Sequence, residues 1–285
     1  MSDSQPTPDP ARSYGSVAEA YHRGRPGYPA EAVRWMLGTE PRIVLELGAG
    51  TGKLTDVMVA EGHAVHAVEP DMEMLAILER EVPGASAKQA VAEEIPANDN
   101  SVDVVVVGQA FHWFDHARAL PEIARILKPE GEIALVWNSP DLRIPWVRRL
   151  CDLIGHQDQD TSSVDELVNS GLFGFVEDTT FKAWQDVNRE SIIDLALSRS
   201  SIASLDADHR AEKLAQVADF YSEYGRGHYG MQVPYTVRCF RARVLDPVAD
   251  SGTFEVVVGP QTDVGGDEPR ADEGPGDDML LIDFK

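Results

Sequence analysis

A short apolar strand runs directly into a glycine-rich loop, and this junction limits the folds open to the chain. Residues 44–52 read VLELGAGTG, and residues 53–61 then have the pattern of a helix that stops at Gly62. Glycines let the backbone turn sharply and let a ligand lie against main-chain atoms. The junction therefore predicts a ligand site at the carboxyl end of a parallel strand.

Strand and helix patterns continue to alternate along the next 80 residues or so. Further strands are expected at residues 63–69, 102–107 and 132–138, and helices at Met72–Glu81 and 116–127. The strand VDVVVV is apolar almost throughout, which is typical of a strand covered on both faces. This alternation predicts an α/β fold with a doubly wound parallel sheet and helices on both faces.

After residue 138 the rhythm changes and helical patterns become more frequent. We expect a turn at 128–131 (KPEG), helices at 145–154, 163–171, 189–198 and 206–224, and extended segments at 181–187 and 233–245. We interpret this half as the closing strands of the same sheet together with a helical insert.

The acidic residues are concentrated toward the C-terminus. Residues 246–285 contain 11 acidic and 2 basic side chains, so they carry −9 of the net charge of −23. Because such a segment has too little apolar surface to offset its ordering entropy, we expect a largely disordered acidic tail there, and a flexible arm at residues 1–13. Between them we expect one domain at 14–245, with a cofactor half (14–138) and a substrate-cap half (139–245).

Charge and composition exclude several classes of protein. A surface this acidic repels nucleic-acid backbones and anionic membranes, so neither is an expected partner. The longest apolar stretch, residues 102–111, is far too short to cross a bilayer. The first residues have no basic and apolar regions of a secretory signal, and two cysteines are too few for a disulfide framework, so we expect a cytoplasmic protein. The chain has no HExxH or CxxC pattern, so no metal is expected.

The acid at the end of the second strand helps to identify the ligand. Glu69 lies 21 residues after Gly48, where a carboxylate can accept hydrogen bonds from both hydroxyls of a ribose. The dinucleotide pattern GxGxxG fails, because its third glycine would fall on Lys53. The alternating Gly48, Gly50 and Gly52 fit S-adenosylmethionine better, since that ligand has no pyrophosphate to place at a helix end.

Several motifs, in this order, resemble the class I S-adenosylmethionine-dependent methyltransferases of the small-molecule type, with a type 11 methyltransferase domain. The nearest resemblance is to the branch that contains trans-aconitate methyltransferase. The motifs are VLELGAGTG, AVEPD (67–71), AEEIP (92–96), SVDVVVVGQAFHWFD (101–115) and ILKPEG (126–131). The resemblance implies a Rossmann-like, seven-stranded, mostly parallel sheet with a helical substrate cap. It also implies S-adenosyl-L-methionine as cofactor and a small-molecule substrate, methylated on a carboxylate or hydroxyl oxygen.

The resemblance also implies a set of cofactor-binding residues from the N-terminal covering segment, the glycine loop and the strand ends. They are Tyr21, Arg25, Glu46, Gly48, Ala49, Gly50, Gly52, Glu69, Pro70, Met72, Ala92, Glu93 and Gln109. In this assignment Glu69 binds the ribose and Met72 covers the adenine, although Met72 would suit a helix core equally well. Tyr21 or Arg25 is assigned to the cofactor carboxylate, with a surface position or a helix cap as the alternative for Arg25.

Candidate substrate contacts follow the fourth and fifth strands and lie in the cap half. His112 and Trp113 are expected near the transferred methyl group, where an aromatic ring favours a sulfonium. His112 is a candidate base there, with a hydrogen bond across the cleft as the alternative role. Asn138 is a candidate for orienting the acceptor, or it caps a turn. Arg199 and Tyr235 are further candidates, since an arginine can bind a carboxylate bidentately; a structural role for Arg199 is the alternative.

Two other functions remain open at this point. A nicotinamide-dependent oxidoreductase would use a similar sheet, but the glycine spacing disfavours it. A catalytically silent binding protein on the same fold would keep the glycines and Glu69. The sequence gives no indication of the oligomeric state.

Overall fold

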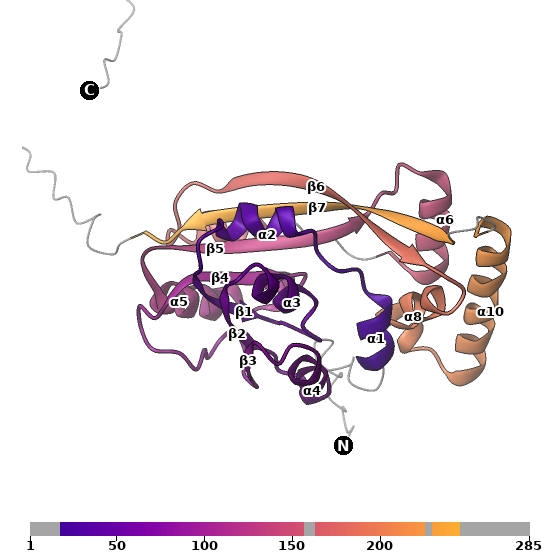
Figure 1. The fold of residues 1–285 in the computed structure, drawn as a ribbon, viewed down its shortest axis with the longest axis horizontal. Helices are drawn as coiled ribbons and strands as arrows, with labels where there is room; N and C mark the ends of the chain where they lie inside the picture. Colours follow the sequence, from indigo (N-terminus) through magenta and orange to yellow (C-terminus); the bar gives the residue numbers. More distant parts are fainter. Residues whose placement is uncertain (1–17, 157–162, 226–229, 246–285) are drawn as a thin grey trace, which may run out of the picture. The chain divides into compact units, whose positions relative to one another are not determined.

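The computed structural model of the protein describes residues 18–156, 163–225 and 230–245 (Figure 1). All of these belong to one unit of the chain, Met1–Ala249. The expected arm at 1–13 and tail at 246–285 lie outside the described residues.

A seven-stranded sheet in the order β3-β2-β1-β4-β5-β7-β6 forms the centre of the fold. Its strands are β1 (Ile43–Leu47), β2 (Ala64–Val68), β3 (Ser86–Lys88), β4 (Val102–Gly108), β5 (Leu127–Pro140), β6 (Glu177–Val187) and β7 (Met231–Arg243). Strand β7 pairs antiparallel with both of its neighbours, and the other pairs are parallel. The predicted α/β fold with a mostly parallel sheet is confirmed.

Helices cover both faces of this sheet. The helices of the described residues, including those of the cap, are α1 (Ala18–Gly24), α2 (Ala30–Leu37), α3 (Lys53–Ala60), α4 (Met72–Glu81), α5 (His116–Ile126), α6 (Pro145–Ile154), α7 (Ser163–Asn169), α8 (Ser191–Leu197), α9 (Ser200–Ala203) and α10 (Ala207–Tyr224). Helices α2 and α3 share an apolar cluster with Val104 and Val106, whereas α5 and α7 share another with Val105 and Val107. Successive side chains of a strand point to opposite faces, so β4 is buried on both, as its apolar run predicts.

The helical cap predicted for the second half is present. Side chains from α6, α8 and α10 form a third apolar cluster with the ends of β6 and β7. Helix α1 lies beside α8 (Figure 1), where the guanidinium of Arg23 donates to both carboxylate oxygens of Asp194 at 2.8 and 3.0 Å. On its other side, α1 is linked to α4 by hydrogen bonds from Arg80 to Glu19. The covering segment is therefore held between the cap and the cofactor half.

Some elements differ from the sequence prediction. The covering segment contains two helices, α1 and α2, and the three-residue strand β3 was not expected. Strand β6 begins at Glu177, four residues before the expected start. The KPEG turn at 128–131 lies within β5 as a bulge, because the register passes from the pair Val102–Leu127 to the pair Val104–Glu132.

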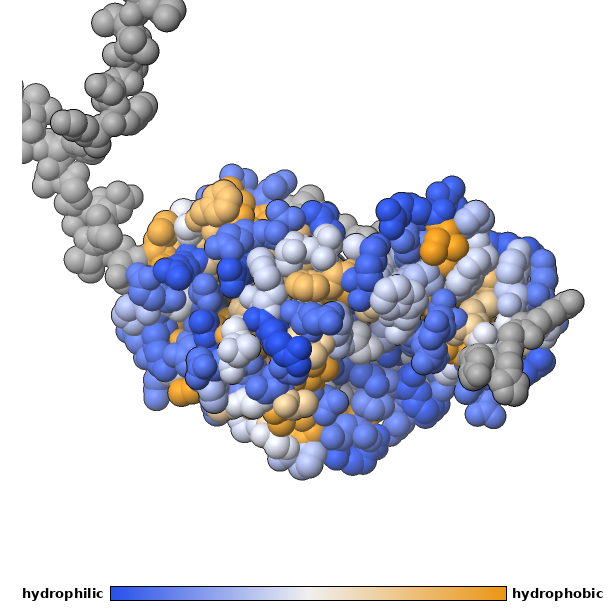
Figure 2. Space-filling model, turned by 45° about the horizontal axis from the view of Figure 1, so that its top comes forward, coloured by the Kyte–Doolittle hydropathy of each residue, from blue (hydrophilic) through white to orange (hydrophobic). Residues whose placement is uncertain are grey.

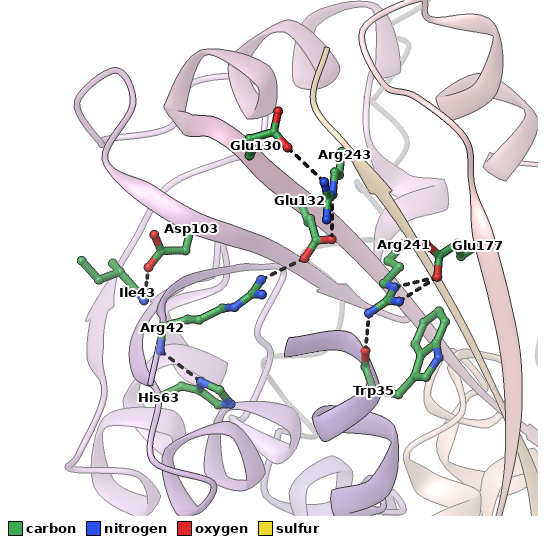
Figure 3. Close-up of polar contacts among 10 residues, drawn as sticks. All are labelled: Trp35, Arg42, Ile43, His63, Asp103, Glu130, Glu132, Glu177, Arg241 and Arg243. Carbon is green, nitrogen blue, oxygen red and sulfur yellow. Dashed lines mark hydrogen bonds and ion pairs between the residues drawn. The ribbon is translucent and has the colours of Figure 1, made fainter. Parts of the chain in front are cut away.

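Polar contacts close the edge of the sheet at which the parallel strands begin (Figure 3). Arg42 donates to Glu132 at 2.9 Å, and Arg243 lies 3.6 Å from the same carboxylate. At the start of β4, Asp103 accepts from the backbone N–H of Ile43 at 2.8 Å. These residues tie β1, β4, β5 and β7 together at the end of the sheet opposite the glycine loop, so they support the fold rather than the site.

The described surface is mixed in character. On the face drawn in Figure 2, hydrophobic residues form small separate patches among hydrophilic ones. None of the helices within the described ranges has the length and hydropathy needed to span a membrane.

Candidate functional site

Two adjoining hollows lie at the carboxyl ends of β1, β2, β4 and β5. The first is lined by Glu69, Pro70, Met74, Ala92, Glu93 and Trp113, among others. The second is lined by Arg25, Glu46, Thr51, Lys53 and Asn138, among others. The two share five lining residues: Tyr21, Gly48, Gly50, Gly108 and Gln109. They form one continuous candidate site at the edge of the sheet where a doubly wound fold places its ligand.

The glycine loop between β1 and α3 has a backbone that only glycine adopts easily. Gly48, Gly50 and Gly52 have φ values of 67°, 57° and 85°. A Cβ atom on Gly48 would lie 2.5 Å from the Cβ of Ala110, so the loop approaches the segment after β4 too closely for a side chain. The N–H groups of Gly48 and Ala49 donate to the carbonyl of Val68 at the end of β2. The loop is thereby fixed against two neighbouring strand ends.

Glu69 is fixed at the wall of the first hollow. Its side chain is 5% exposed, and its two carboxylate oxygens accept from the N–H groups of Gly50 at 2.8 Å and Asp71 at 2.9 Å. Burial raises the pKa of Glu69 to about 7, while these two backbone hydrogen bonds oppose that shift. Each oxygen retains a further lone pair that can accept from a ligand hydroxyl.

Glu46 occupies the corresponding place in the second hollow. It is 2% exposed and accepts a hydrogen bond of 2.5 Å from the hydroxyl of Thr55. Burial raises the pKa of Glu46 to about 8, and the negative charge of Glu69 adds to the effect. A cationic ligand group beside Glu46 would lower this pKa again, because a nearby positive charge favours the ionised carboxylate. Glu46 is therefore a suitable partner for such a group.

Two buried oxygen atoms of the second hollow have no hydrogen-bond partner among the described residues. They are Oδ1 of Asn138 and Oγ1 of Thr51. The other polar atoms of Asn138 are engaged. Its side-chain Nδ2 donates to the backbone carbonyl of Gly27, and its backbone carbonyl accepts from the side-chain amide of Gln109. Buried polar atoms are normally paired, so these two mark positions where a polar ligand group fits.

The residue after β4 holds an unusual backbone conformation. Gln109 has a φ of 62°, its N–H donates to the carbonyl of Val136, and it lines both hollows. A left-handed conformation costs a non-glycine residue roughly 1–2 kcal/mol, and such residues cluster at functional sites.

Most of the residues predicted for the cofactor do line the hollows. These are Tyr21, Arg25, Glu46, Gly48, Ala49, Gly50, Glu69, Pro70, Ala92, Glu93 and Gln109. Their roles toward a ligand stay predictions. Glu93 also has a role within the protein, because its carboxylate accepts from the N–H of Asp115 at 2.8 Å.

Two cofactor predictions are corrected by the structure. Met72 begins α4, is 67% exposed and does not line either hollow, whereas Met74 is buried and lines the first one. Met74 therefore replaces Met72 as the candidate thioether cover for the adenine. Gly52 lies behind the loop, where a Cβ atom would approach Leu78 of α4 to 2.9 Å, so its glycine serves helix packing.

Of the candidate substrate contacts, some line the hollows and others do not. Trp113 lines the first hollow and Asn138 the second. His112 does not line either; it lies in the short 3-10 helix η3 (Phe111–Trp113), with its ring centroid 4.6 Å from that of Trp113. Arg199 and Tyr235 are buried outside both hollows, because the packing of the cap encloses them. The hydroxyl of Tyr235 donates to Gln185, which indicates a structural role.

Several lining residues were not predicted from the sequence. They include Tyr28, Thr51, Lys53, Met74 and Phe114. Thr51 and Lys53 lie in or next to the glycine loop, so their position alone could have identified them. Tyr28 lies in the covering segment, and its hydroxyl approaches the backbone of Gly108 so closely that a Cβ atom there would lie 3.0 Å away.

Comparison with known proteins identifies the family. Residues 45–135 match the family model described as a methyltransferase domain. An uncharacterized methyltransferase of Mycobacterium tuberculosis is 42% identical over 236 residues, which are 82% of this chain and 96% of the relative. The chain belongs to the class I methyltransferases. The nearer resemblance to the trans-aconitate branch stays a prediction.

Solved structures of methyltransferases share this fold. A putative type II methyltransferase of Anaeromyxobacter dehalogenans superimposes with a TM-score of 0.61 at 22% identity, over 77% of this chain and 97% of that one. A phosphoethanolamine N-methyltransferase of Haemonchus contortus, solved in complex with S-adenosyl-L-methionine, gives 0.50 at 14% identity, over 82% and 59%. At these identities the likeness extends to the fold alone.

Proposed function

We propose that this methyltransferase uses S-adenosyl-L-methionine and transfers its methyl group to an oxygen of a small-molecule acceptor. The observation that carries the proposal is the fixed carboxylate of Glu69 between the glycine loop and the N-terminus of α4. Backbone N–H groups fix its two oxygens, and each keeps a lone pair with which it would accept from a ribose hydroxyl. The family assignment and the ligand of the Haemonchus structure support the same cofactor.

The two hollows match the two halves of this cofactor. In the first, Glu69 would accept from the ribose, Met74 would pack on the adenine, and Ala92 would adjoin its edge. In the second, Glu46 and Oδ1 of Asn138 would accept from the amino group. The residues shared by both hollows, Tyr21 and Gln109 among them, would then surround the sulfur.

The carboxylate of the cofactor also has suitable partners in the second hollow. Lys53 and Arg25 line it and carry positive charge, and the hydroxyl of Thr51 can donate a hydrogen bond. The polar atoms of the second hollow thus include both acceptors and donors, as an amino-acid group demands. An apolar or purely anionic ligand would leave some of them unpaired.

When bound, S-adenosyl-L-methionine supplies an electrophilic methyl group. The protein's task is to align the acceptor with it and to exclude water. No histidine is among the residues that line the two hollows in the described part of the chain. A carboxylate acceptor needs no base, because its oxygen is already ionised. A hydroxyl acceptor is the second candidate; its candidate base, His112, lines neither hollow itself but packs against Trp113, which lines the first one.

Parallel calorimetric titrations with S-adenosyl-L-methionine and NAD test this proposal. We expect only the former to bind, and Glu69→Ala to weaken its binding by at least about tenfold, because two hydrogen bonds to a charged group are lost. Glu94→Ala is the matched control, since Glu94 is an exposed acid nearby that does not line either hollow. Binding of NAD alone would revive the oxidoreductase. Binding of S-adenosyl-L-methionine without methyl transfer to any of a broad panel of acids and phenols would favour a silent protein.

A further inference from the structure

We propose that the outer edge of β6 is a self-association surface, on which a second copy of this chain pairs antiparallel about a two-fold axis at Trp184. Strand β6 is the last strand of the sheet, and Figure 1 shows it along one margin. Among the described residues, no strand pairs with its outer side. At 11 residues it is a long edge strand, and a long edge is a template for another strand. This inference goes beyond the proposed function and does not depend on it.

The register between β6 and β7 shows which backbone groups of β6 face outward. Trp184 lies opposite Pro234, whose carbonyl accepts at 2.9 Å from the N–H of Asp141, the residue after β5. The backbone of Pro234 therefore points toward β5, so Trp184 and Pro234 form a pair without mutual backbone hydrogen bonds. Because this pattern alternates along a strand, the N–H and C=O groups of Lys182, Trp184 and Asp186 point away from β7. They form a row to which a further strand can bind.

The side chains of these three residues share one face of the edge. Trp184 is 62% exposed, and Lys182 and Asp186 flank it along the strand. Both charged side chains have a partner within the protein: Lys182 lies 3.5 Å from Asp141, and Asp186 accepts from Gln232 at 2.7 Å. An ammonium has three donors and a carboxylate about four acceptor positions, so each retains capacity for a second partner. The face thus presents a positive group, an aromatic ring and a negative group in order.

A two-fold axis at Trp184 makes this order complementary to itself. In an antiparallel pair centred there, the two Trp184 rings face each other, and Lys182 of each copy lies opposite the partner's Asp186. Aromatic pairs and opposite charges across strands stabilise a sheet, whereas a pair centred on Lys182 or Asp186 would place like charges opposite each other. Facing residues in this register also exchange both of their backbone hydrogen bonds. A lysine usually protects an edge strand from pairing, but here the same strand supplies the opposite charge at the matching position.

The overall charge determines how strong such a dimer can be. A net charge of −23 on each copy opposes association. Salt screens this long-range repulsion, since the Debye length is about 8 Å at physiological ionic strength, whereas the facing Lys182 and Asp186 groups would be in direct contact. Each copy contributes a single strand, so the interface is small. We therefore expect a reversible dimer and not a permanent one.

The test combines sedimentation of the full-length protein, from low to high micromolar concentration at physiological salt, with hydrogen exchange of the β6 amides in the same samples. We expect a monomer–dimer equilibrium in which the amides of Lys182, Trp184 and Asp186 become protected as the dimer forms. Protection of these amides in a monomer would mean that another segment of the chain covers the edge. That result would overturn the inference, as would a monomer at every concentration or a dimer in which these amides stay unprotected.

Charge substitutions test the register. Asp186→Lys should weaken the dimer at least about tenfold, because two attractive cross-strand pairs become repulsive, and adding Lys182→Glu to it should restore the affinity. Asp178→Lys is the matched control: it changes the net charge equally, and Asp178 is an exposed acid of β6 that lies outside the stretch paired in this register. Weakening by Asp178→Lys instead of Asp186→Lys, or no rescue in the double variant, would contradict the register.

A proline substitution tests the backbone pairing. Trp184→Pro should abolish the dimer, because it removes the outward N–H at the axis. The thermal unfolding midpoint of the monomer should change little, because that N–H makes no hydrogen bond to β7. If the proline variant does not fold, Trp184→Ala serves instead and should weaken the dimer through loss of the aromatic pair. A dimer of unchanged affinity in the folded variant would overturn the inference.

Discussion

Glu46→Gln should stabilise the ligand-free protein at neutral pH and at the same time weaken cofactor binding. The pKa of Glu46 is raised by burial to about 8, against an ordinary value of 4.5. Between these two values the folded protein keeps a proton that the unfolded chain has lost. Its free energy of unfolding therefore falls as pH rises, by about 1.4 kcal/mol per pH unit from this group. Glutamine has nearly the same volume and does not titrate.

The stability effect can be measured by urea unfolding of both proteins from pH 5.5 to 7.5. The difference in unfolding free energy, variant minus wild type, should grow by about 2.7 kcal/mol over these two units. Taking a difference between the two proteins removes the contributions of titrating groups that do not interact with Glu46. A difference that stays constant with pH would refute the reasoning about Glu46.

Cofactor binding should depend on pH in the opposite sense. An ammonium group pairs with the ionised carboxylate, so at pH 7 binding must remove a proton from a group whose pKa is about 8. This step costs about 1.4 kcal/mol, so affinity should rise about tenfold between pH 6.5 and 7.5 and level off above 8. Calorimetry in buffers of different ionisation enthalpy should detect the release of about one proton at pH 7 by the wild type. The glutamine variant should bind more weakly and release less.

Three further substitutions, together with one control substitution, test the packing around the site. Gly48→Ala forces a side chain into a left-handed position with a contact of 2.5 Å, and should lower the unfolding free energy by roughly 2 kcal/mol or more in urea titrations. Gly24→Ala would bring a Cβ atom into the backbone of Asp194, so it should displace α1 and weaken cofactor binding in calorimetry. Gly27→Ala is its control: with open space around it, this substitution should change neither binding nor stability by more than about 0.5 kcal/mol. Thr51→Val removes a buried hydroxyl that has no partner among the described residues, so thermal unfolding should show no loss of stability while cofactor affinity falls.

The sheet could be predicted because its strands are short, apolar and separated by regular helices. Strand β1 runs into the glycine loop and helix α4 has the expected bounds, with Asp71 capping α4 by accepting from two backbone N–H groups. The covering helices could not be predicted in the same way. Helix α1 is seven residues long, and what holds it is a set of distant contacts with α8 and α4 that no local pattern records.

The site residues also differ in whether local sequence or distant packing determines their position. Most of those next to the glycine loop and strand ends were predicted, because strand order alone brings them together, although Thr51 and Lys53 were missed. The exchange of Met72 for Met74 depends on the phase of α4, and motif matching does not specify which of two methionines in the first turn faces inward. The burial of Arg199 and Tyr235 depends on how the cap packs, which joins residues from α6, α8, α10 and two strands.

A crystal structure of the complex with S-adenosylhomocysteine tests the proposed cofactor site most directly. We expect the ribose hydroxyls on Glu69, the adenine beside Met74, and the amino group between Glu46 and Asn138. A ligand bound elsewhere, or the adenosine half lying in the second hollow against Glu46, would contradict this assignment.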